Sequence, residues 1–250
     1  MNPISEVFNC DCIEYMRGLP DNAFDLVIAD PPYGGANNPT INGGGGSVSD
    51  STGTGQPRLR REVRKIQCSR TGGTWAAKYG GIIAWDTAPN EDFFNELFRV
   101  SKEQVIWGAN YFPNMPATRC FLVWRKQTIS EKFTMAMAEY AWTSFNGNAK
   151  VFEYPPQGKN GDRFHPTQKP VELYAWVLRM FAKSGDRIFD PMMGSQSSRI
   201  AAYKLGYDFC GCELDKEYFE KGCERFEREC HGITKMQDGT TVRQLSLFDD

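Results

Sequence analysis

The stretch Phe24-Asp-Leu-Val-Ile-Ala-Asp-Pro-Pro-Tyr33 decides both the fold and the chemistry of this chain. Its apolar part, Phe24 to Ala29, predicts a strand. Two prolines then fix the backbone φ and remove two N–H donors, and Pro31 restricts Asp30 to an extended conformation. The strand is therefore expected to end in a rigid group of hydrogen-bond acceptors made by Asp30, Pro31, Pro32 and Tyr33.

A second strand-ending turn lies in the last quarter of the chain. A strand at 187–189 is followed by Asp190-Pro-Met-Met-Gly194-Ser195 and then by a helix, so the glycine allows a ligand to approach the backbone. Glu213 follows Asp190 by 23 residues, close to the spacing at which an acidic side chain meets the hydroxyl pair of a ribose. Asp11 ends the first strand and is a third acceptor. An ordinary connection between strand and helix is the alternative for this turn alone.

The pattern indicates which ligand and which reaction to expect. No G-x-G-x-x-G is present, which disfavours a dinucleotide and favours S-adenosylmethionine, a nucleoside without phosphate. The Asp30 carboxylate and the Pro31 carbonyl can each accept a hydrogen from an amino group on a base ring, which favours a pyramidal nitrogen facing an incoming methyl group. Tyr33 offers a flat face for a base extruded from the duplex. The alternative is a turn in which Asp30 caps and Tyr33 packs.

Strands alternate with helices along most of the chain, which predicts an α/β fold with a mostly parallel sheet covered on both faces. The expected strands are 6–10, 24–29, 104–108, 120–125, 138–145, 187–189 and 208–212, and the expected helices are 13–17, 90–100, 171–182, 197–205 and 217–230. Residues 34–81 are rich in glycine, serine and threonine and are too long for an ordinary connection, so they form either a functional flap or a partly disordered insertion.

Composition sets the limits of these interpretations. A chain of 250 residues with 40% hydrophobic content supplies one core, so we expect a single domain at 1–232 and a flexible tail at 233–250. Lysine plus arginine number 29 against 31 acidic residues, so binding to a polyanion needs local clusters of charge. No leader or membrane-spanning segment is expected, which indicates a cytoplasmic protein with no membrane partner. The eight cysteines are expected as reduced thiols, the pairs Cys10/Cys12 and Cys210/Cys212 each sharing one face of a strand, and the spacing of cysteine and histidine predicts no metal.

These motifs resemble those of the amino-group DNA methyltransferases, specifically the circularly permuted β group in which the catalytic motif precedes the cofactor motif. The resemblance covers most of the chain and implies a Rossmann-like, seven-stranded fold. In that family Asp-Pro-Pro-Tyr is the catalytic motif, and aspartate at its start implies transfer to adenine N6. Cytosine-N4 enzymes more often begin the motif with serine, and cytosine-N4 methylation remains the alternative.

The resemblance also assigns residues to the cofactor. The motif His165-Pro-Thr-Gln-Lys-Pro170 and the helix start after it imply contacts with the methionine end, Asn9-Cys-Asp11-Cys12 with the adenine, and Glu213 with the ribose. The full predicted cofactor set is Asp11, Cys12, Asp30, His165, Thr167, Gln168, Lys169, Asp190, Pro191, Met193, Gly194, Ser195, Ser197, Glu213 and Leu214. Segments 107–112 and 138–142 resemble family segments near the target base.

One residue departs from the family pattern. Gly194-Ser195-Gln196 stands where the family usually has Gly-Ser-Gly. A left-handed Gln196 costs on the order of 1 kcal/mol, which puts cofactor affinity in question. A DNA-binding module without catalysis is the corresponding alternative function.

DNA contacts and further partners are predicted from local segments. A basic run of Arg58, Arg60, Arg61, Arg64, Lys65 and Arg70 is expected to neutralise phosphates of double-stranded DNA, and a solvated charge run is the alternative. Sequence readout is expected in the insertion or in 157–163, within the short loop 146–164. The tail Gln244-Leu245-Ser246-Leu247-Phe248 resembles the pentapeptide that docks on the bacterial sliding clamp, although it can also pack on its own domain. A homodimer is a further expectation.

Overall fold

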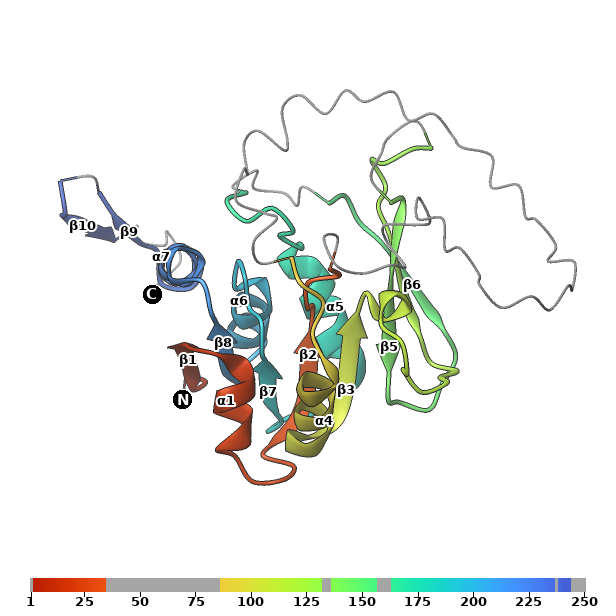
Figure 1. The fold of residues 1–250 in the computed structure, drawn as a ribbon. Helices are drawn as coiled ribbons and strands as arrows, with labels where there is room; N and C mark the ends of the chain where they lie inside the picture. The colour runs from red at the N-terminus through yellow and green to blue at the C-terminus, as the bar shows by residue number, and fades with distance from the viewer. Residues whose placement is uncertain (1, 35–85, 132–135, 157–162, 237, 244–250) are drawn as a thin grey trace, which may run out of the picture.

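The computed structural model describes residues 2–34, 86–131, 136–156, 163–236 and 238–243 (Figure 1). Its elements in chain order are β1 (Ser5–Asn9), α1 (Cys12–Arg17), β2 (Phe24–Ala29), α4 (Glu91–Val100), β3 (Ser101–Trp107), the 3-10 helix η1 (Ala109–Tyr111), β4 (Leu122–Arg125), β5 (Ala138–Thr143), β6 (Lys150–Glu153), α5 (Val171–Phe181), β7 (Arg187–Asp190), α6 (Ser197–Lys204), β8 (Asp208–Glu213), α7 (Lys216–His231), β9 (Ile233–Lys235) and β10 (Thr241–Arg243). No helix within these ranges is long and apolar enough to cross a membrane. The basic run 58–70, the insertion beyond residue 34 and the pentapeptide 244–248 lie outside the described residues.

The main sheet has the strand order β1-β8-β7-β2-β3-β5-β4-β6. The first five strands of this order pair in parallel, β5 runs antiparallel to both β3 and β4, and β4 pairs in parallel with β6. The mostly parallel α/β fold is therefore confirmed.

The sheet has eight strands where seven were expected, because part of the predicted loop 146–164 forms the edge strand β6. This strand is only four residues long, and its ring Phe152 stacks on Trp176 of α5 with centroids 5.0 Å apart. Its order therefore comes from packing and not from a pattern that four residues can display.

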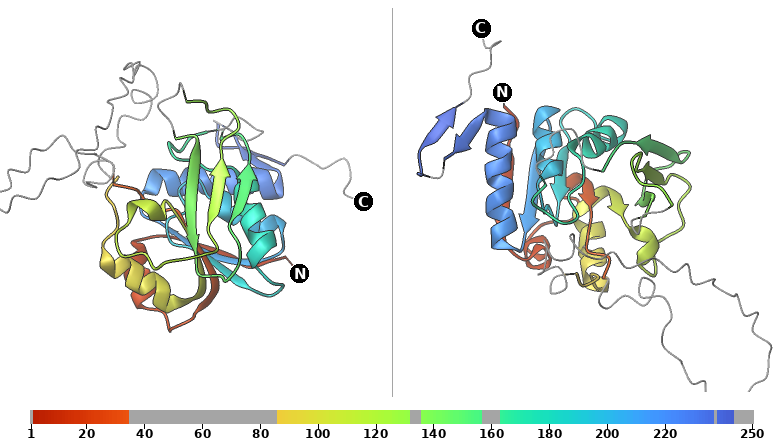
Figure 2. Two further views of the ribbon diagram at one scale, coloured as in Figure 1. Left: turned by 90° about the vertical axis from the view of Figure 1, so that its right-hand side faces the viewer. Right: turned by 90° about the horizontal axis from the view of Figure 1, so that it is seen from above.

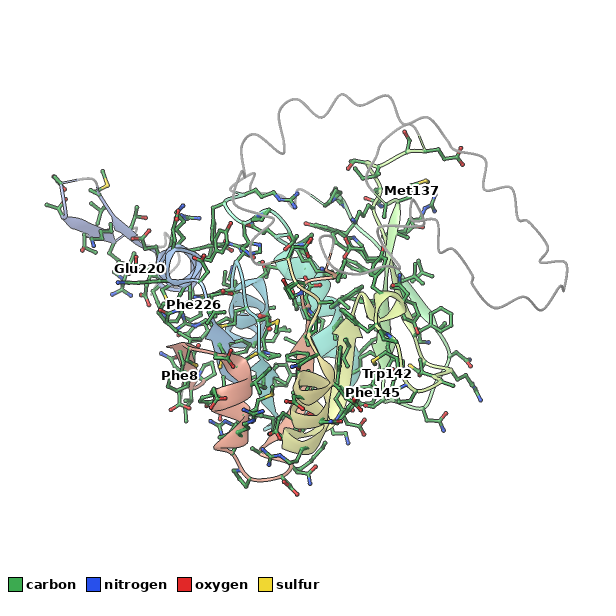
Figure 3. All side chains as sticks on the ribbon, viewed as in Figure 1. Phe8, Met137, Trp142, Phe145, Glu220 and Phe226 are labelled. Carbon is green, nitrogen blue, oxygen red and sulfur yellow. The ribbon has the colours of Figure 1, made fainter. Side chains whose placement is uncertain are left out.

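Helices cover both faces of the sheet (Figures 1 and 2). Successive side chains of β2 enter different clusters: Leu26 and Ile28 pack with α5 and α6, whereas Val27 and Ala29 pack with α1 and α4. The continuous apolar run of β2 is thus the consequence of burial on both faces. Side chains fill the space between the sheet and the helices on both of its faces (Figure 3). On one face, Cζ of Arg199 on α6 lies 3.7 Å from the ring centroid of Phe226 on α7.

Two local expectations differ from the structure. Cys12 begins α1 and does not share a strand with Cys10, because the Asp11 carboxylate caps this helix and ends the strand region. Residues 233–235 and 241–243, expected as part of a flexible tail, pair as the antiparallel strands β9 and β10 after Gly232 ends α7 with φ 66°.

Candidate active site

The carboxyl ends of four neighbouring strands bring the predicted acids together. β1, β8, β7 and β2 are parallel and adjacent, so they end at the same edge of the sheet. That edge carries Asp11 after β1, Glu213 at the end of β8, Asp190 at the end of β7 and Asp30 after β2. An α/β sheet binds its ligands at this edge.

The side chain of Asp190 is turned inward. It is 1% exposed, and its Oδ1 accepts the Met192 N–H at 3.0 Å while its Oδ2 accepts the Ser198 hydroxyl at 2.5 Å. Burial raises the pKa of Asp190 to about 7, although these two hydrogen bonds favour the ionised form. Asp190 therefore shapes the turn after β7 from within.

The serines after this turn are also turned inward. Ser197 Oγ donates to the Lys169 carbonyl at 2.7 Å, and Arg225 donates to the Ser195 carbonyl at 3.0 Å and to Ser197 Oγ at 2.8 Å. Met193 is buried and packs over Gly211, where a Cβ would lie 2.5 Å from its sulfur. These side chains, which were predicted to contact the cofactor, tie the β7 turn to the 165–170 segment and to α7.

Gln196 adopts the left-handed conformation, with φ 59° and ψ 26°. Its amide nitrogen donates to the Phe219 carbonyl at 3.1 Å, and its amide oxygen accepts from Arg199 at 2.9 Å. Gly222 of α7 leaves room for it, since a Cβ there would lie 2.7 Å from Gln196 Cγ. The contacts with α7 therefore compensate for the absence of the family glycine.

Glu213 and its neighbours present groups that suit a nucleoside. Glu213 Oε2 accepts the Gly194 N–H at 2.7 Å and Oε1 accepts the Asp215 N–H at 2.9 Å, and burial raises the pKa of this carboxyl. Leu214, directly after it, is 69% exposed. A carboxylate for hydroxyl groups beside an exposed apolar side chain for a planar base matches the chemistry of S-adenosylmethionine. The described residues contain no group of histidine, cysteine and acidic side chains that could hold a metal ion.

The segment 165–170 folds as a turn over the cofactor region. The His165 ring lies against Gly194, where a Cβ would be 3.2 Å from its Cε1. Burial and the charges of Arg163 and Lys169 lower the pKa of His165 to about 4. Thr167 is exposed at this turn, and Gln168 accepts the Phe164 N–H at 3.4 Å.

Lys169 points to the catalytic tetrapeptide. Its Nζ forms an ion pair with Asp30 Oδ2 and donates to the Tyr33 hydroxyl at 3.3 Å. The Tyr33 hydroxyl donates in turn to Asp30 Oδ1 at 3.0 Å. The resemblance implies that Lys169 helps to bind the methionine end of the cofactor, and in the structure its ammonium contacts Asp30.

Two further charged residues complete this buried cluster. Lys169 Nζ lies 3.1 Å from Glu139 Oε2, and Lys126 Nζ lies 2.5 Å from Glu139 Oε1. The lysine side chains are 4% and 7% exposed. Burial opposes ionisation of Glu139, but the two lysines outweigh it and lower its pKa to about 2, while burial raises the pKa of Asp30.

The sequence analysis missed Lys126 and included Glu139 only as part of segment 138–142. No motif marks either residue. The one available signal was Glu139 itself, a carboxylate within the expected strand 138–145 that stands between the apolar Ala138 and the aromatic Tyr140. The ion pair of Lys126 with Glu139 links the residue after β4 to β5 and becomes visible only in the folded sheet.

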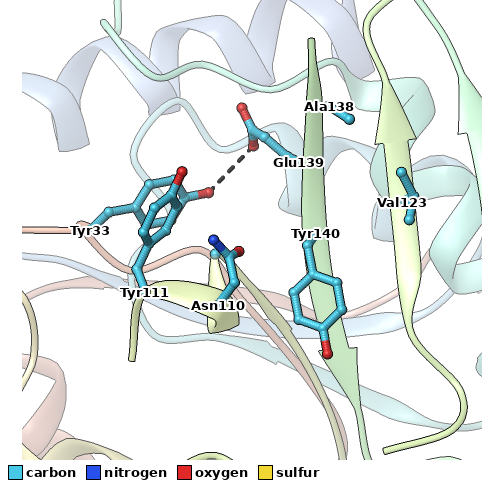
Figure 4. A pocket seen from close by; sticks show the side chains of 8 residues that line it. Tyr33, Asn110, Tyr111, Val123, Ala138, Glu139 and Tyr140 are labelled. Atoms are coloured by element: carbon cyan, nitrogen blue, oxygen red, sulfur yellow. Dashed lines mark hydrogen bonds between the residues drawn. The ribbon is translucent and has the colours of Figure 1, made fainter. Parts of the chain in front are cut away.

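A pocket of about 140 Å³ opens beside this cluster (Figure 4). It is lined by Tyr33, Gly108, Asn110, Tyr111, Val123, Ala138, Glu139 and Tyr140. The rings of Tyr33 and Tyr111 stack with centroids 4.9 Å apart and planes at 28°. Gly108 has φ 68°, and a Cβ there would lie 2.0 Å from Tyr33 Cε1, so this glycine is needed for the ring position. Segments 107–112 and 138–142 thus lie beside Tyr33, as the resemblance implied.

Comparisons with known proteins agree with this geometry. The DNA methylase family matches residues 106–224, a range that contains the 165–170 turn and the ends of β7 and β8. The Type II methyltransferase M2.DpnII of Streptococcus pneumoniae is 26% identical, covering 88% of each chain. The Type II methyltransferase M2.MboI of Moraxella bovis is 23% identical, covering 91% of this chain and 88% of its own.

Solved structures share the fold. TTHA0409 of Thermus thermophilus, a proposed DNA modification methylase, is 18% identical with a TM-score of 0.53, covering 92% of this chain and 97% of its own. The cytosine-N4-specific PvuII DNA methyltransferase is 13% identical with a TM-score of 0.51, covering 91% of this chain and 93% of its own. The fold, the family match and the juxtaposed strand ends agree: residues 106–224 match the DNA methylase family, and the chain is similar to Type II methyltransferases over most of its length.

Proposed function

We propose that this protein transfers a methyl group from S-adenosylmethionine to N6 of an adenine flipped out of double-stranded DNA. One observation carries the proposal: β2 and β7 are paired neighbours, with Leu26 opposite Ile188 and Val27 opposite Phe189. The acceptor group at Asp30 therefore lies next to the turn that follows Asp190. Target and cofactor sites can share one edge of the sheet, as methyl transfer requires.

Several segments of the cofactor region are suited to different parts of S-adenosylmethionine. When bound, S-adenosylmethionine supplies a methyl group activated by its sulfonium. Glu213 is suited to the ribose hydroxyls, Leu214 and the Asp11–Cys12 segment to the adenine ring, and His165, Thr167 and Gln168 to the methionine end. The buried side chains of Asp190, Ser195 and Ser197 hold the backbone in place for these contacts.

The target region binds and orients the amino group. Asp30 and the Pro31 carbonyl accept its two hydrogens, which directs the nitrogen lone pair away from them. Tyr33 and Tyr111 form an aromatic wall for the base, beside the pocket that Asn110 also lines. The negative charge of the Asp30 carboxylate also stabilises the positive charge that develops on the nitrogen.

Analysis of the modified base tests the proposal against its two alternatives. DNA incubated with the protein and S-adenosylmethionine is digested to nucleosides and identified by mass, and N6-methyladenine is expected. N4-methylcytosine would establish the cytosine alternative. Calorimetry with S-adenosylmethionine alone tests the non-catalytic alternative, which predicts that no saturable binding occurs.

Further partners are separate proposals. The basic residues between Arg58 and Arg70 contact DNA phosphates, and their removal should reduce the salt dependence of DNA binding. The tail 244–248 binds the sliding clamp. A pulldown of the clamp that is unchanged when Leu247 and Phe248 are both replaced by alanine would contradict this proposal. Sedimentation of the purified chain decides whether it forms a homodimer.

A further inference from the structure

Lys169 lies between two buried carboxylates that come from different strands. Its ammonium contacts Asp30 at the end of β2 and Glu139 of β5, and only 4% of its side chain is exposed. Lys126 holds the far oxygen of Glu139. The cluster therefore contains two positive and two negative groups in one line, Lys126–Glu139–Lys169–Asp30.

This arrangement has a consequence for substrate binding. Both oxygens of Asp30 already accept hydrogen bonds, Oδ2 from Lys169 and Oδ1 from the Tyr33 hydroxyl. A target amino group must donate to the same carboxylate. The amino group and the Lys169 ammonium then compete for the Asp30 carboxylate, and an ammonium that loses this contact needs another acceptor, because burying it without one is strongly unfavourable.

We propose that Glu139 is a positioning residue that retains the Lys169 ammonium when a target amino group takes its place on Asp30. The ammonium needs only a small shift, because it already lies 3.1 Å from Glu139 Oε2. Glu139 is held ready by the Lys126 contact and by its place on β5, which is paired on both sides with β3 and β4. This inference rests on the proposed function, since it concerns the amino group of the target base.

The groups that surround Lys169 define its titration. Asp30 and Tyr33 face it from the end of β2, Glu139 faces it from β5, and Lys126 lies behind Glu139. The charge of Lys169 helps to lower the pKa of His165 on the same segment, and the charge of Asp30 helps to raise the pKa of Tyr174 on α5. Burial opposes the charged form of Lys169, but Asp30 and Glu139 together raise its pKa. Loss of Glu139 therefore lowers that pKa.

The test compares Glu139→Gln with a charge-balanced variant. In Glu139→Gln, kcat should fall by about 30-fold or more, the size expected when one partner of a buried charge pair is lost, while S-adenosylmethionine affinity stays near that of the wild type. Glu139→Gln combined with Lys126→Met removes one charge of each sign, which protects folding. We expect the same defect in this double variant. Glu153→Gln is the matched control, because Glu153 lies on β6 in an exposed pair with Arg125.

Two readouts separate positioning from a structural role. The kcat of both Glu139 variants should rise with pH relative to the wild type, because a neutral Lys169 amine releases Asp30. Fluorescence of a 2-aminopurine placed beside the target adenine, with S-adenosylhomocysteine in place of the methyl donor, should report poorer entry of the adenine without any methyl transfer. Wild-type kcat in the double variant, or a pH profile and fluorescence unchanged in both variants, would overturn the inference.

The inference and the proposed function fail in different ways. If wild-type protein yields no methylated adenine, the proposed function fails, and the fluorescence comparison still measures base entry in the variants. If the wild type methylates adenine and the variants match it, only the role of Glu139 fails.

Discussion

The cofactor half and the target half of the site both bury a carboxyl group, and the pKa values of the two groups shift in opposite directions. Asp190 has its pKa raised to about 7 by burial, with only a hydroxyl and a backbone N–H as partners. Glu139 is also buried, yet Lys169 and Lys126 hold its pKa at about 2. Burial alone therefore does not decide ionisation: two lysines lower the pKa of Glu139, whereas one lysine does not outweigh the burial that raises the pKa of Asp30.

The contrast extends to how each half is built. The cofactor half consists of turns at the ends of β7 and β8, held by hydrogen bonds to the backbone. The target half consists of four charged side chains from four separate segments. Changes in the cofactor half should mainly affect affinity and stability, whereas changes in the target half should mainly affect turnover.

Replacing Asp30 should have the largest effect, and it should impair the target half of the site while leaving the cofactor half intact. Asp30→Ala removes the carboxylate that accepts the amino hydrogen, so kcat should fall by about 100-fold to 1000-fold. Radiolabelled methyl transfer measures kcat, and calorimetry should show S-adenosylmethionine affinity within a few-fold of the wild type. Full methylation activity in this variant would contradict the assignment.

Asp190→Asn tests the ionisation of the cofactor half. A carboxyl whose folded pKa is raised contributes stability that is complete below its unfolded pKa, near 4, and is lost as the pH rises through about 7. The wild type should therefore lose about 1.4 kcal/mol of unfolding free energy relative to the variant for each pH unit of that window. Urea unfolding across the window measures the difference. Asp92→Asn, at an exposed site, is the control, and a constant difference between wild type and Asp190→Asn would refute the idea.

Gly108→Ala tests the target half of the site by shifting the Tyr33 ring. A Cβ at Gly108 would lie 2.0 Å from Tyr33 Cε1, so the Tyr33 ring must shift and kcat should fall by about tenfold, equal to about 1.4 kcal/mol in the barrier. Gly206→Ala is the matched control, since Gly206 also has positive φ, 80°, but no atom within 4 Å of the added Cβ. Both variants carry the strain of a positive φ, and Gly108→Ala should lose more stability on heating because its Cβ also meets the Tyr33 ring. Equal activities would show that the Tyr33 position is unimportant.

Glu213→Gln should have the smallest effect and alters affinity. The neutral amide keeps the shape of the side chain but weakens hydrogen bonds to ribose hydroxyls, so the Kd for S-adenosylmethionine should rise about tenfold. The kcat at saturating cofactor should change little. Calorimetry decides, with Glu217→Gln on the exposed face of α7 as the control. An unchanged Kd would remove Glu213 from the cofactor site.

Most elements were predictable because their signals are local. The strand Phe24–Ala29 is confirmed at both ends, and the helix expected at 171–182 ends one residue earlier, at Phe181. Comparing Gln196 with the family glycine raised the question of a left-handed conformation, and the structure shows one. In contrast, β6 has only four residues and gains its order from packing on α5, so no periodicity could reveal it.

Local sequence was enough to predict the strand that ends in Asp-Pro-Pro-Tyr, the turn after β7, the acid at the end of β8 and the order in which they occur. These features depend on backbone φ, proline and glycine, which act between residues close in the chain. Only the tertiary structure decided that Lys169 lies on Asp30 and that Glu139 and Lys126 continue the line of charges. Charges separated by long stretches of chain interact only after the sheet brings their strands together and excludes water, and no local pattern encodes that distance.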